Sequence, residues 1–174
     1  LPFDAERTVA DVLGVAPVIA ALDALAAGDA SEEVFAAIGD DWDVEERLRA
    51  QLDRLGLSHV AMDRRLESCS GGEVVSIGLA AQLLRRPDVL LLDEPTNNLD
   101  GDARHRLYDA LDDFGGALLV VSHDRVLLDR MDRIAELHRG EIVFYGGSFT
   151  DYENALEMAR RAAEADVRNA EQTL

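Results

Sequence analysis

Residues 89–100 read VLLLDEPTNNLD, and this stretch decides the fold expected for the chain. Its apolar residues lead directly into two adjacent carboxylates, Asp93 and Glu94, and Pro95 then ends the run. A short apolar run bounded by a turn signal predicts a buried strand of a parallel sheet. Open α/β sheets bind ligands at the carboxyl ends of their strands, where this pair would lie. Because carboxylates there need a positive partner, the pair predicts a magnesium ion with a water molecule to be activated.

Length and composition place the chain among globular domains. Its 174 residues fit one domain, or one domain with an appendage, and a hydrophobic content of 48% is enough for a packed core. No apolar stretch reaches the roughly 18 residues of a membrane span. The first residues lack the pattern of a secretory signal. The single cysteine, Cys69, suits a reducing compartment, so a cytoplasmic location is expected.

The charge is strongly acidic. There are 35 acidic and 17 basic residues, for a net charge of -18, and every basic residue is Arg because the chain contains no Lys. Nucleic-acid binding usually needs a basic surface, which this chain as a whole does not supply.

The first third of the chain is expected to be helical, without obvious chemistry. Trp42, in an acidic turn, is interpreted as a packing anchor. The expected helices run from Thr8 to about Gly28 with an interruption or kink at Pro17, from Ser31 to Ile38 with Gly39 as the stop, and from Asp43, in a capping box with Glu46, to Gly56.

The stretch SCSGGE, residues 68–73, combines a helix start with two glycines. Ser70 and Glu73 have the spacing of a capping box, and Gly71 and Gly72 leave the amides of the first turn unobstructed. A helix start with bare N–H groups and a serine hydroxyl is a candidate anion site. On these six residues alone, an ordinary capped helix remains the competing interpretation.

A strand–helix–strand unit follows. An amphipathic helix over 102–114 and a second buried strand over 117–121 predict, with the strand at 89–93, a right-handed parallel βαβ unit. Parallel strands end on the same side of a sheet, so His123 is expected at the same edge as Asp93 and Glu94. A histidine at a strand end is often structural, but the shared edge favours a functional role.

The last third predicts a hairpin and a long helix. Residues 133–137 and 141–145 flank a turn at Gly140. Residues 149–174 form one polar helix rich in Ala, Glu and Arg, with too few apolar residues for a full core face.

Three motifs in this order and spacing, SGGE, LLLDEPTNNLD and VVSHDRVLLD, resemble the nucleotide-binding domain of an ATP-binding cassette (ABC) ATPase. The NNLD and SHDR contexts resemble the ABC-F subfamily of soluble twin-cassette proteins without membrane domains. YGGSFTDYE and the helix after it resemble the end of a first cassette entering the interdomain linker. The resemblance implies an α/β fold, an incomplete P-loop NTPase domain with a parallel sheet core. Its parts would be a helical subdomain over 1–68, the ATPase core over 69–148 and a linker helix over 149–174.

The resemblance also implies roles for the matching positions. Asp93 would hold Mg²⁺ through water, Glu94 would be the general base, and His123 would contact the γ-phosphate of ATP. Asp100 would be the D-loop residue that couples the two cassettes. The signature motif would bind ATP held by the opposite cassette through Ser70, Gly71, Gly72 and Glu73.

Two departures from the family pattern stand out. Cys69 occupies the position where the signature motif usually has Leu. No G-x-x-x-x-G-K-[ST] loop is present, and without Lys no disguised version of this phosphate loop can exist. We interpret the chain as part of a first cassette that begins after the Q-loop, with a degenerate cassette as the alternative. Such a part is expected to be inactive alone and, because sheet edges are exposed, to self-associate or be marginally stable.

The function expected from the resemblance is ATP hydrolysis with Mg²⁺ in an ABC-F protein. It also implies action on the ribosome, as a translation factor or in antibiotic resistance. The acidic charge would leave RNA contacts to other parts of the protein, or to a local group formed by Arg160, Arg161 and Arg168. The alternatives are the energising subunit of a membrane transporter, disfavoured because EVVSIGLAAQLL follows the SGG, and a non-enzymatic binding module.

Overall fold

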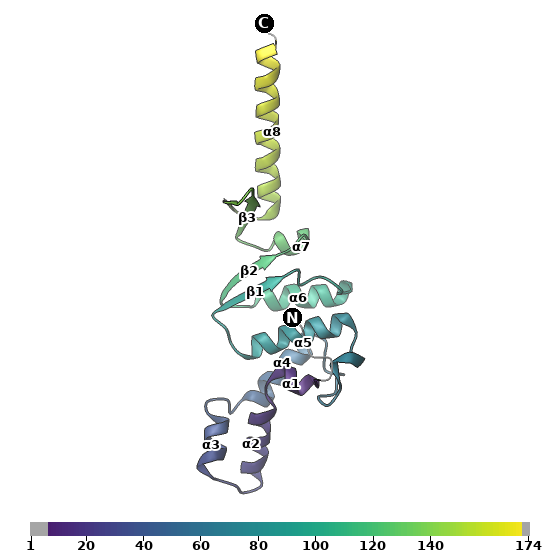
Figure 1. The fold of residues 1–174 in the computed structure, drawn as a ribbon, viewed down its shortest axis with the longest axis vertical. Coiled ribbons are helices and arrows are strands. Elements are labelled where there is room, and N and C mark those ends of the chain that lie inside the picture. Colours follow the sequence, from purple (N-terminus) through teal and green to yellow (C-terminus); the bar gives the residue numbers. More distant parts are fainter. Residues whose placement is uncertain (1–6, 172–174) are drawn as a thin grey trace. The chain divides into compact units, whose positions relative to one another are not determined.

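The computed structural model describes residues 7–171 and forms two compact units, one ending at Val121 and the other beginning at Ser122. The first unit contains α1 (Val9–Leu13), α2 (Ala16–Ala26), α3 (Glu32–Ile38), α4 (Val44–Arg54), the 3-10 helix η1 (Leu66–Ser68), α5 (Gly71–Leu84), β1 (Val89–Asp93), α6 (Gly101–Asp112) and β2 (Ala117–Val121) (Figure 1). The second contains α7 (Arg125–Leu128), β3 (Arg133–His138), β4 (Glu141–Gly146) and α8 (Phe149–Glu171). The three-part division expected at residues 68 and 148 stays a prediction.

The first predicted helix is two helices. Thr8 caps α1 in a reciprocal capping box with Asp11, and Gly14, with φ of 72°, ends it. Pro17 lies in the first turn of α2, where its missing N–H removes no helical hydrogen bond. The chain is therefore interrupted at Gly14, and Pro17 begins a helix rather than kinking one.

The next two helices test the capping predictions. Ser31 caps α3 through its hydroxyl, and Gly39, with φ of 52°, ends that helix as predicted. Asp43 precedes α4 but makes no capping bond, so the predicted capping box is wrong. Its carboxylate instead binds the guanidinium groups of Arg47 and Arg86, both at 2.9 Å. A charged donor outcompetes a backbone amide for the same oxygens.

Trp42 is not the buried anchor that the sequence suggested. Its side chain is 53% exposed and packs only partly, with its ring centroid 6.2 Å from that of Phe35, which is also exposed. The core lies elsewhere in this unit. Its most deeply buried large side chains are Val9, Leu13, Ile38, Leu57 and Ile77.

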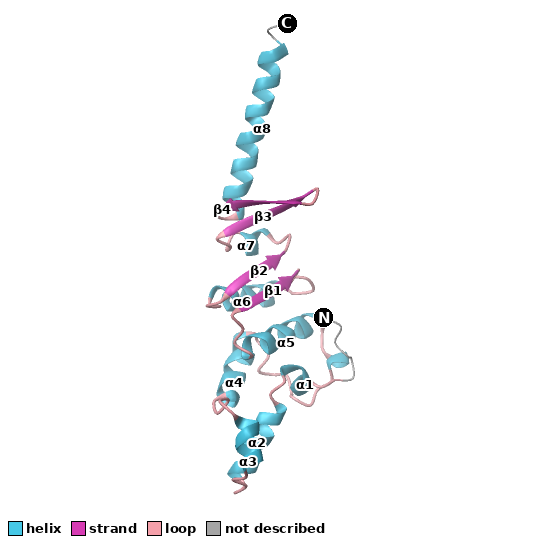
Figure 2. Cartoon of the chain, turned by 60° about the vertical axis from the view of Figure 1, so that its left-hand side comes forward, coloured by secondary structure: helices cyan, strands magenta, loops and turns pink. Residues whose placement is uncertain are grey.

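The strands β1 and β2 are connected by α6 and pair directly with each other in parallel (Figure 2). This confirms the predicted βαβ unit and the α/β class. Val89 lies opposite Ala117 and Asp93 opposite Val121. The prediction that both strands are buried is wrong. Burial alternates along them, so Leu90 is 3% exposed while Leu91 is 67% exposed. Helices therefore cover one face of this strand pair in the described chain, and the other face is open and apolar.

The second unit contains the predicted hairpin and long helix. Arg139 and Gly140 both have positive φ, 50° and 84°, as a two-residue turn with the twist of the strands requires. The helix α8 begins against this hairpin, where the Tyr145 and Tyr152 rings meet edge to face at 4.8 Å. It extends to Glu171, and residues 172–174 of the predicted helix lie outside the described residues. Over residues 7–171, no helix has the length and apolar character that crossing a membrane would need.

Candidate functional site

The start of α5 carries the SGGE motif on a reciprocally capped helix end. The Ser70 hydroxyl oxygen accepts a hydrogen bond from the Glu73 amide at 3.2 Å, and the Glu73 carboxylate accepts one from the Ser70 amide at 2.7 Å. This confirms the predicted capping box. A serine hydroxyl that accepts through a lone pair can still donate its own hydrogen. The side chain of Ser70 can therefore cap the helix and bind an anion at once.

The Glu73 carboxylate is held by groups from three segments of the chain. Its second oxygen lies 3.1 Å from Nη1 of Arg64 and 3.2 Å from Nε2 of His59. The backbone bond from Ser70 is the main cause that lowers the pKa of Glu73 from 4.5 to about 2; partial burial acts in the opposite direction, and His59 and Arg64 lower it further. Glu73 is therefore a firmly ionised carboxylate.

The two glycines of the motif lie against the turn that follows β1. A Cβ atom on Gly72 would lie 3.1 Å from the carbonyl oxygen of Asn98, and one on Gly71 would lie 3.4 Å from Cβ of Asn98. Contacts as short as 3.1 Å would force one backbone to move. The absence of side chains on these glycines thus lets the start of α5 approach the turn at 95–99 closely.

Cys69 immediately precedes the motif. Its side chain is half-buried against the segment that contains Arg65. Its Sγ donates to the carbonyl oxygen of Arg65 at 3.6 Å, and burial raises the pKa of the thiol. The neutral thiol therefore occupies the position at which the resemblance led us to expect a leucine.

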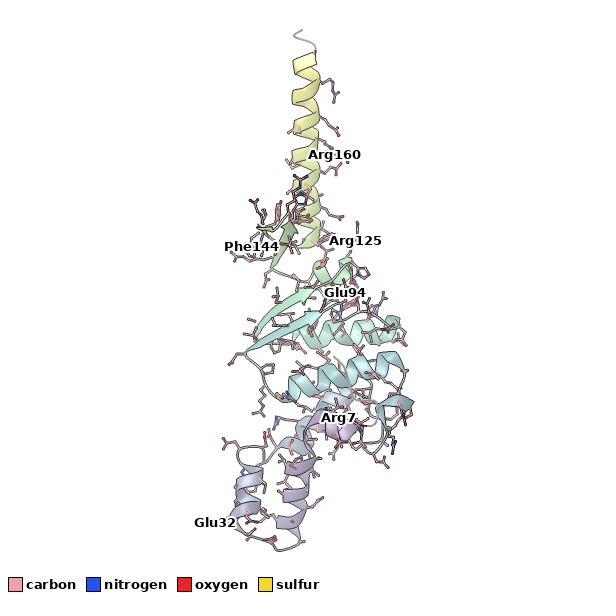
Figure 3. All side chains as sticks on the ribbon, viewed as in Figure 1. Arg7, Glu32, Glu94, Arg125, Phe144 and Arg160 are labelled. Atoms are coloured by element: carbon pink, nitrogen blue, oxygen red, sulfur yellow. The ribbon has the colours of Figure 1, made fainter. Side chains whose placement is uncertain are left out.

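Glu94 occupies an unusual backbone conformation at the end of β1. Its φ is 46°, and its amide donates to the carbonyl oxygen of Val121 at 2.7 Å, which extends the β1–β2 ladder by one bond. Figure 3 labels Glu94. Left-handed backbone costs a residue with a side chain roughly 1–2 kcal/mol and clusters at functional sites. Asp93, the last residue of β1, is exposed, while Glu94 is half-buried. The two carboxylates thus lie at a strand end whose backbone conformation is held by a hydrogen bond to the neighbouring strand.

The turn after Glu94 is compact and leads into a capped helix. Thr96 is 3% exposed and its carbonyl accepts from the Leu99 amide at 3.3 Å. Asp100, predicted as the D-loop residue, caps α6 by accepting from the Ala103 amide at 2.8 Å. Its side chain therefore has a structural role in this chain, whatever it contributes to cassette coupling.

His123 lies in the second unit, in the short segment between β2 and α7. The next residue, Asp124, caps α7 by accepting from the amides of Val126 and Leu127 at 3.0 and 3.2 Å. The segment that carries His123 is thereby fixed to the start of a helix. Its placement at the edge of Glu94 stays a prediction.

The carboxylates at the end of β1 fit a magnesium ion in a limited way. Within residues 7–171 no group of three or more His, Cys, Asp or Glu side chains could hold a metal. Mg²⁺ usually keeps several waters and takes one or two carboxylates together with phosphate oxygens of a nucleotide. Asp93 with Glu94 supplies that number of carboxylates, so these residues suit Mg²⁺ that arrives with a nucleotide and not a closed protein cage.

The structure thus brings together the start of α5 and the turn after Glu94, which the sequence placed on separate elements. Sequence analysis missed Asn98, Arg64 and His59. Arg64 and His59 precede Glu73 by 9 and 14 residues and belong to no motif, so only the fold of the loop between α4 and α5 reveals them.

Comparison with known proteins gives one family. The model of the ABC transporter family matches residues 5–97, which is more than half of the 174 residues. The tylosin resistance ATP-binding protein TlrC of Streptomyces fradiae is 37% identical over 174 residues, covering 98% of this chain and 32% of that protein. The energy-dependent translational throttle protein EttA of Mycobacterium tuberculosis is 40% identical over 114 residues, covering 65% of this chain and 20% of that protein. The chain thus spans a third or less of these relatives.

Solved structures agree on the fold. The ATP-binding subunit of an ABC transporter matches with a TM-score of 0.63 at 22% identity, over 89% of this chain and 58% of that one. A nucleotide-free ATP-binding cassette from an ABC transporter matches with a TM-score of 0.60 at 21% identity, over 87% of this chain and 60% of that one. These matches confirm the fold class predicted from the motifs.

Proposed function

The chain belongs to the ABC transporter family, and from that membership we propose that it forms part of an ATP-hydrolysing cassette in an ABC-F protein. The observation that carries the proposal is the close approach of Gly72 at the start of α5 to Asn98 in the turn after Glu94. A helix start suited to phosphate and a strand end suited to water activation are thereby joined in one unit. In the proposed arrangement each ATP meets the strand end of one cassette and the helix start of the other, so hydrolysis requires both kinds of group.

In the proposed mechanism the residues of this chain act on ATP bound between two cassettes. Glu94 orients and deprotonates the attacking water, and its half-buried carboxylate is held by a constrained backbone. Asp93 would hold Mg²⁺ through water, and the chemistry that the ion would supply is neutralisation of charge on the phosphates. His123 contacts the γ-phosphate, and Asp100 couples the two cassettes. The signature residues Ser70, Gly71, Gly72 and Glu73 face ATP held by the opposite cassette.

The site in these residues is half of an active site. They contain no phosphate loop and no Lys, so the groups that bind the phosphates in the same cassette must come from outside these residues. We expect the 174-residue chain alone to bind ATP more weakly than about millimolar, which corresponds to about −4 kcal/mol. A dissociation constant for ATP in the micromolar range, measured by calorimetry on this chain, would contradict the interpretation that it contains only half of an active site.

The decisive experiment is Glu94→Gln in the full-length protein. The amide keeps the size of the side chain but removes the base, so turnover should fall by about 10²–10⁴-fold while ATP binding persists. Hydrolysis would be measured by phosphate release, and bound nucleotide by filter retention. Normal turnover in the variant would refute the role of Glu94.

The partner that we propose is the ribosome, in a cytoplasmic protein that acts in translation or antibiotic resistance. The names of EttA and TlrC support this. Two of the three Arg residues considered for RNA contact pair with acidic residues of the same helix: Arg160 with Glu164 at 3.0 Å and Arg161 with Glu157. RNA contacts would therefore lie elsewhere in the full protein. ATP-dependent co-sedimentation with ribosomes at low salt tests the proposal, and its failure would refute it.

A transporter subunit is the second candidate, favoured by the name of the matching family model and of the solved structures. Co-purification of the full-length protein with membrane components instead of ribosomes would support it.

A further inference from the structure

The signature helix presents an electrostatic problem if it binds phosphate. Its start offers backbone amides and a partial positive charge to an anion. Glu73, three residues into the same motif, places a full negative charge at that end, and its pKa of about 2 keeps it ionised. An uncompensated carboxylate there would repel the anion that the helix is expected to bind.

Arg64 lies where it can solve this problem. Its Nη1 is 3.1 Å from Oε1 of Glu73, the oxygen that the capping bond to Ser70 leaves open. The side chains are 32% and 18% exposed, so the ion pair is partly shielded from water and retains more of its strength than a surface pair.

The same guanidinium is fixed on its other side. Nε of Arg64 donates to the Ser68 hydroxyl at 3.2 Å, and Nη2 donates to the Ser68 carbonyl oxygen. The backbone carbonyl of Arg64 accepts from the Val9 amide at 3.0 Å, which ties the residue to α1. Arg64 therefore spans the loop before the motif and the carboxylate inside it. His59 shares the same oxygen of Glu73, but its ring is 65% exposed, and among the hydrogen bonds of the described residues it has none to a second group of the motif.

We propose that Arg64 is a positioning residue of the signature motif: it compensates the charge of Glu73 and holds it in the capping box, so that Ser70 and the first-turn amides can bind the γ-phosphate of ATP. This rests on the function proposed above. Arg64 does not touch the nucleotide; it acts through Glu73.

The test compares charge variants in the full-length protein by steady-state ATP hydrolysis. Arg64→Met removes the charge and keeps much of the length, and it should raise the KM for ATP about fivefold to tenfold with little change in kcat. Arg64→Lys keeps the charge without the forked contact to Ser68 and should lie between wild type and Arg64→Met. Arg65→Met is the matched control, because its neighbouring guanidinium contacts only the exposed Glu67, at 3.7 Å, among the ion pairs of the described residues.

The double variant with Glu73→Gln separates charge compensation from mere support of the fold. The amide still accepts from the Ser70 amide but has no charge to compensate, so Arg64→Met should not raise the KM further in that background. An equal rise in both backgrounds, or an unchanged KM in Arg64→Met, would overturn the inference while wild-type hydrolysis leaves the proposed function standing. A full-length wild type without ATPase activity would overturn both.

Discussion

Glu73 should make the stability of the chain depend on pH in a defined window. A carboxyl whose pKa falls from 4.5 to about 2 on folding would contribute about 3 kcal/mol at neutral pH, and solvent screening lowers this to about 1–2 kcal/mol. Because the folded-state pKa is the lower one, this stability is fully present above about pH 4.5 and is lost as pH falls toward 2. Glu73→Gln removes the titrating group, so its effect on unfolding free energy should be large at pH 7 and small near pH 2.5.

Urea unfolding followed by circular dichroism at several pH values measures this difference. The other acidic residues also titrate in this range, but they change the unfolding free energy of wild type and Glu73→Gln equally. The difference between the two proteins therefore reports on Glu73 alone. Glu67→Gln is the control, since that carboxylate is exposed and its arginine partner lies 3.7 Å away. If the free-energy difference between wild type and Glu73→Gln stayed constant from pH 7 to pH 2.5, the capping and ion-pair account of Glu73 would be refuted.

Three further predictions concern a close backbone contact, hydrogen bonds at the start of a helix, and an exposed apolar sheet face. Gly72→Ala places a methyl group about 3.1 Å from a carbonyl oxygen of the facing turn, so chemical denaturation should show a loss of about 1 kcal/mol and ATP hydrolysis by the full-length protein should fall. Asp129→Ala removes the carboxylate that accepts from the Thr150 amide at 2.7 Å and from the Thr150 hydroxyl at 3.0 Å. The free energy of local opening in the first turn of α8 should fall by about 1–2 kcal/mol, so amide hydrogen exchange should be faster there and unchanged in α5. The 174-residue chain should sediment as dimers or larger species, and Leu91→Glu with Leu119→Glu should shift it toward monomer, because these side chains are 67% and 59% exposed on one apolar sheet face. A wild-type monomer at all concentrations would contradict the last prediction.

Local rules predicted local structure well. The caps at Ser31 and Ser70, the stop at Gly39 and the turn at Gly140 each depend on a few neighbouring residues, and all four were predicted. The cap at Asp43 failed although the same rule applied. There the carboxylate binds Arg47, four residues on, and Arg86, 43 residues away, and no local pattern indicates the second of these competitors.

Burial was harder to predict, because an apolar run indicates a strand without indicating what covers it. Leu90 and Leu91 are equally apolar, yet they are 3% and 67% exposed because they point to opposite faces of the pair. The prediction for Trp42 failed for the same reason: its size predicts contact area, but in its turn the side chain is 53% exposed beside Phe35. The roles of Arg64 and His59 could not be predicted from the sequence, because both side chains act through contacts with one oxygen of Glu73 that only the fold brings about.

Residues with unusual backbone conformations cluster in the turn that follows β1. Among the described residues, four non-glycine residues have positive φ, and two of them, Glu94 and Asn98, lie within one short turn. Asn adopts the left-handed region readily, so Glu94 is the residue whose conformation needs support from its neighbours. The Val121 carbonyl holds the Glu94 amide at 2.7 Å, and Gly72 approaches the Asn98 carbonyl from α5. The start of α5 therefore packs against the same short turn that carries Glu94. In the function proposed above, the signature motif faces one nucleotide and Glu94 acts on another, so this contact is where the two groups of residues meet within one chain.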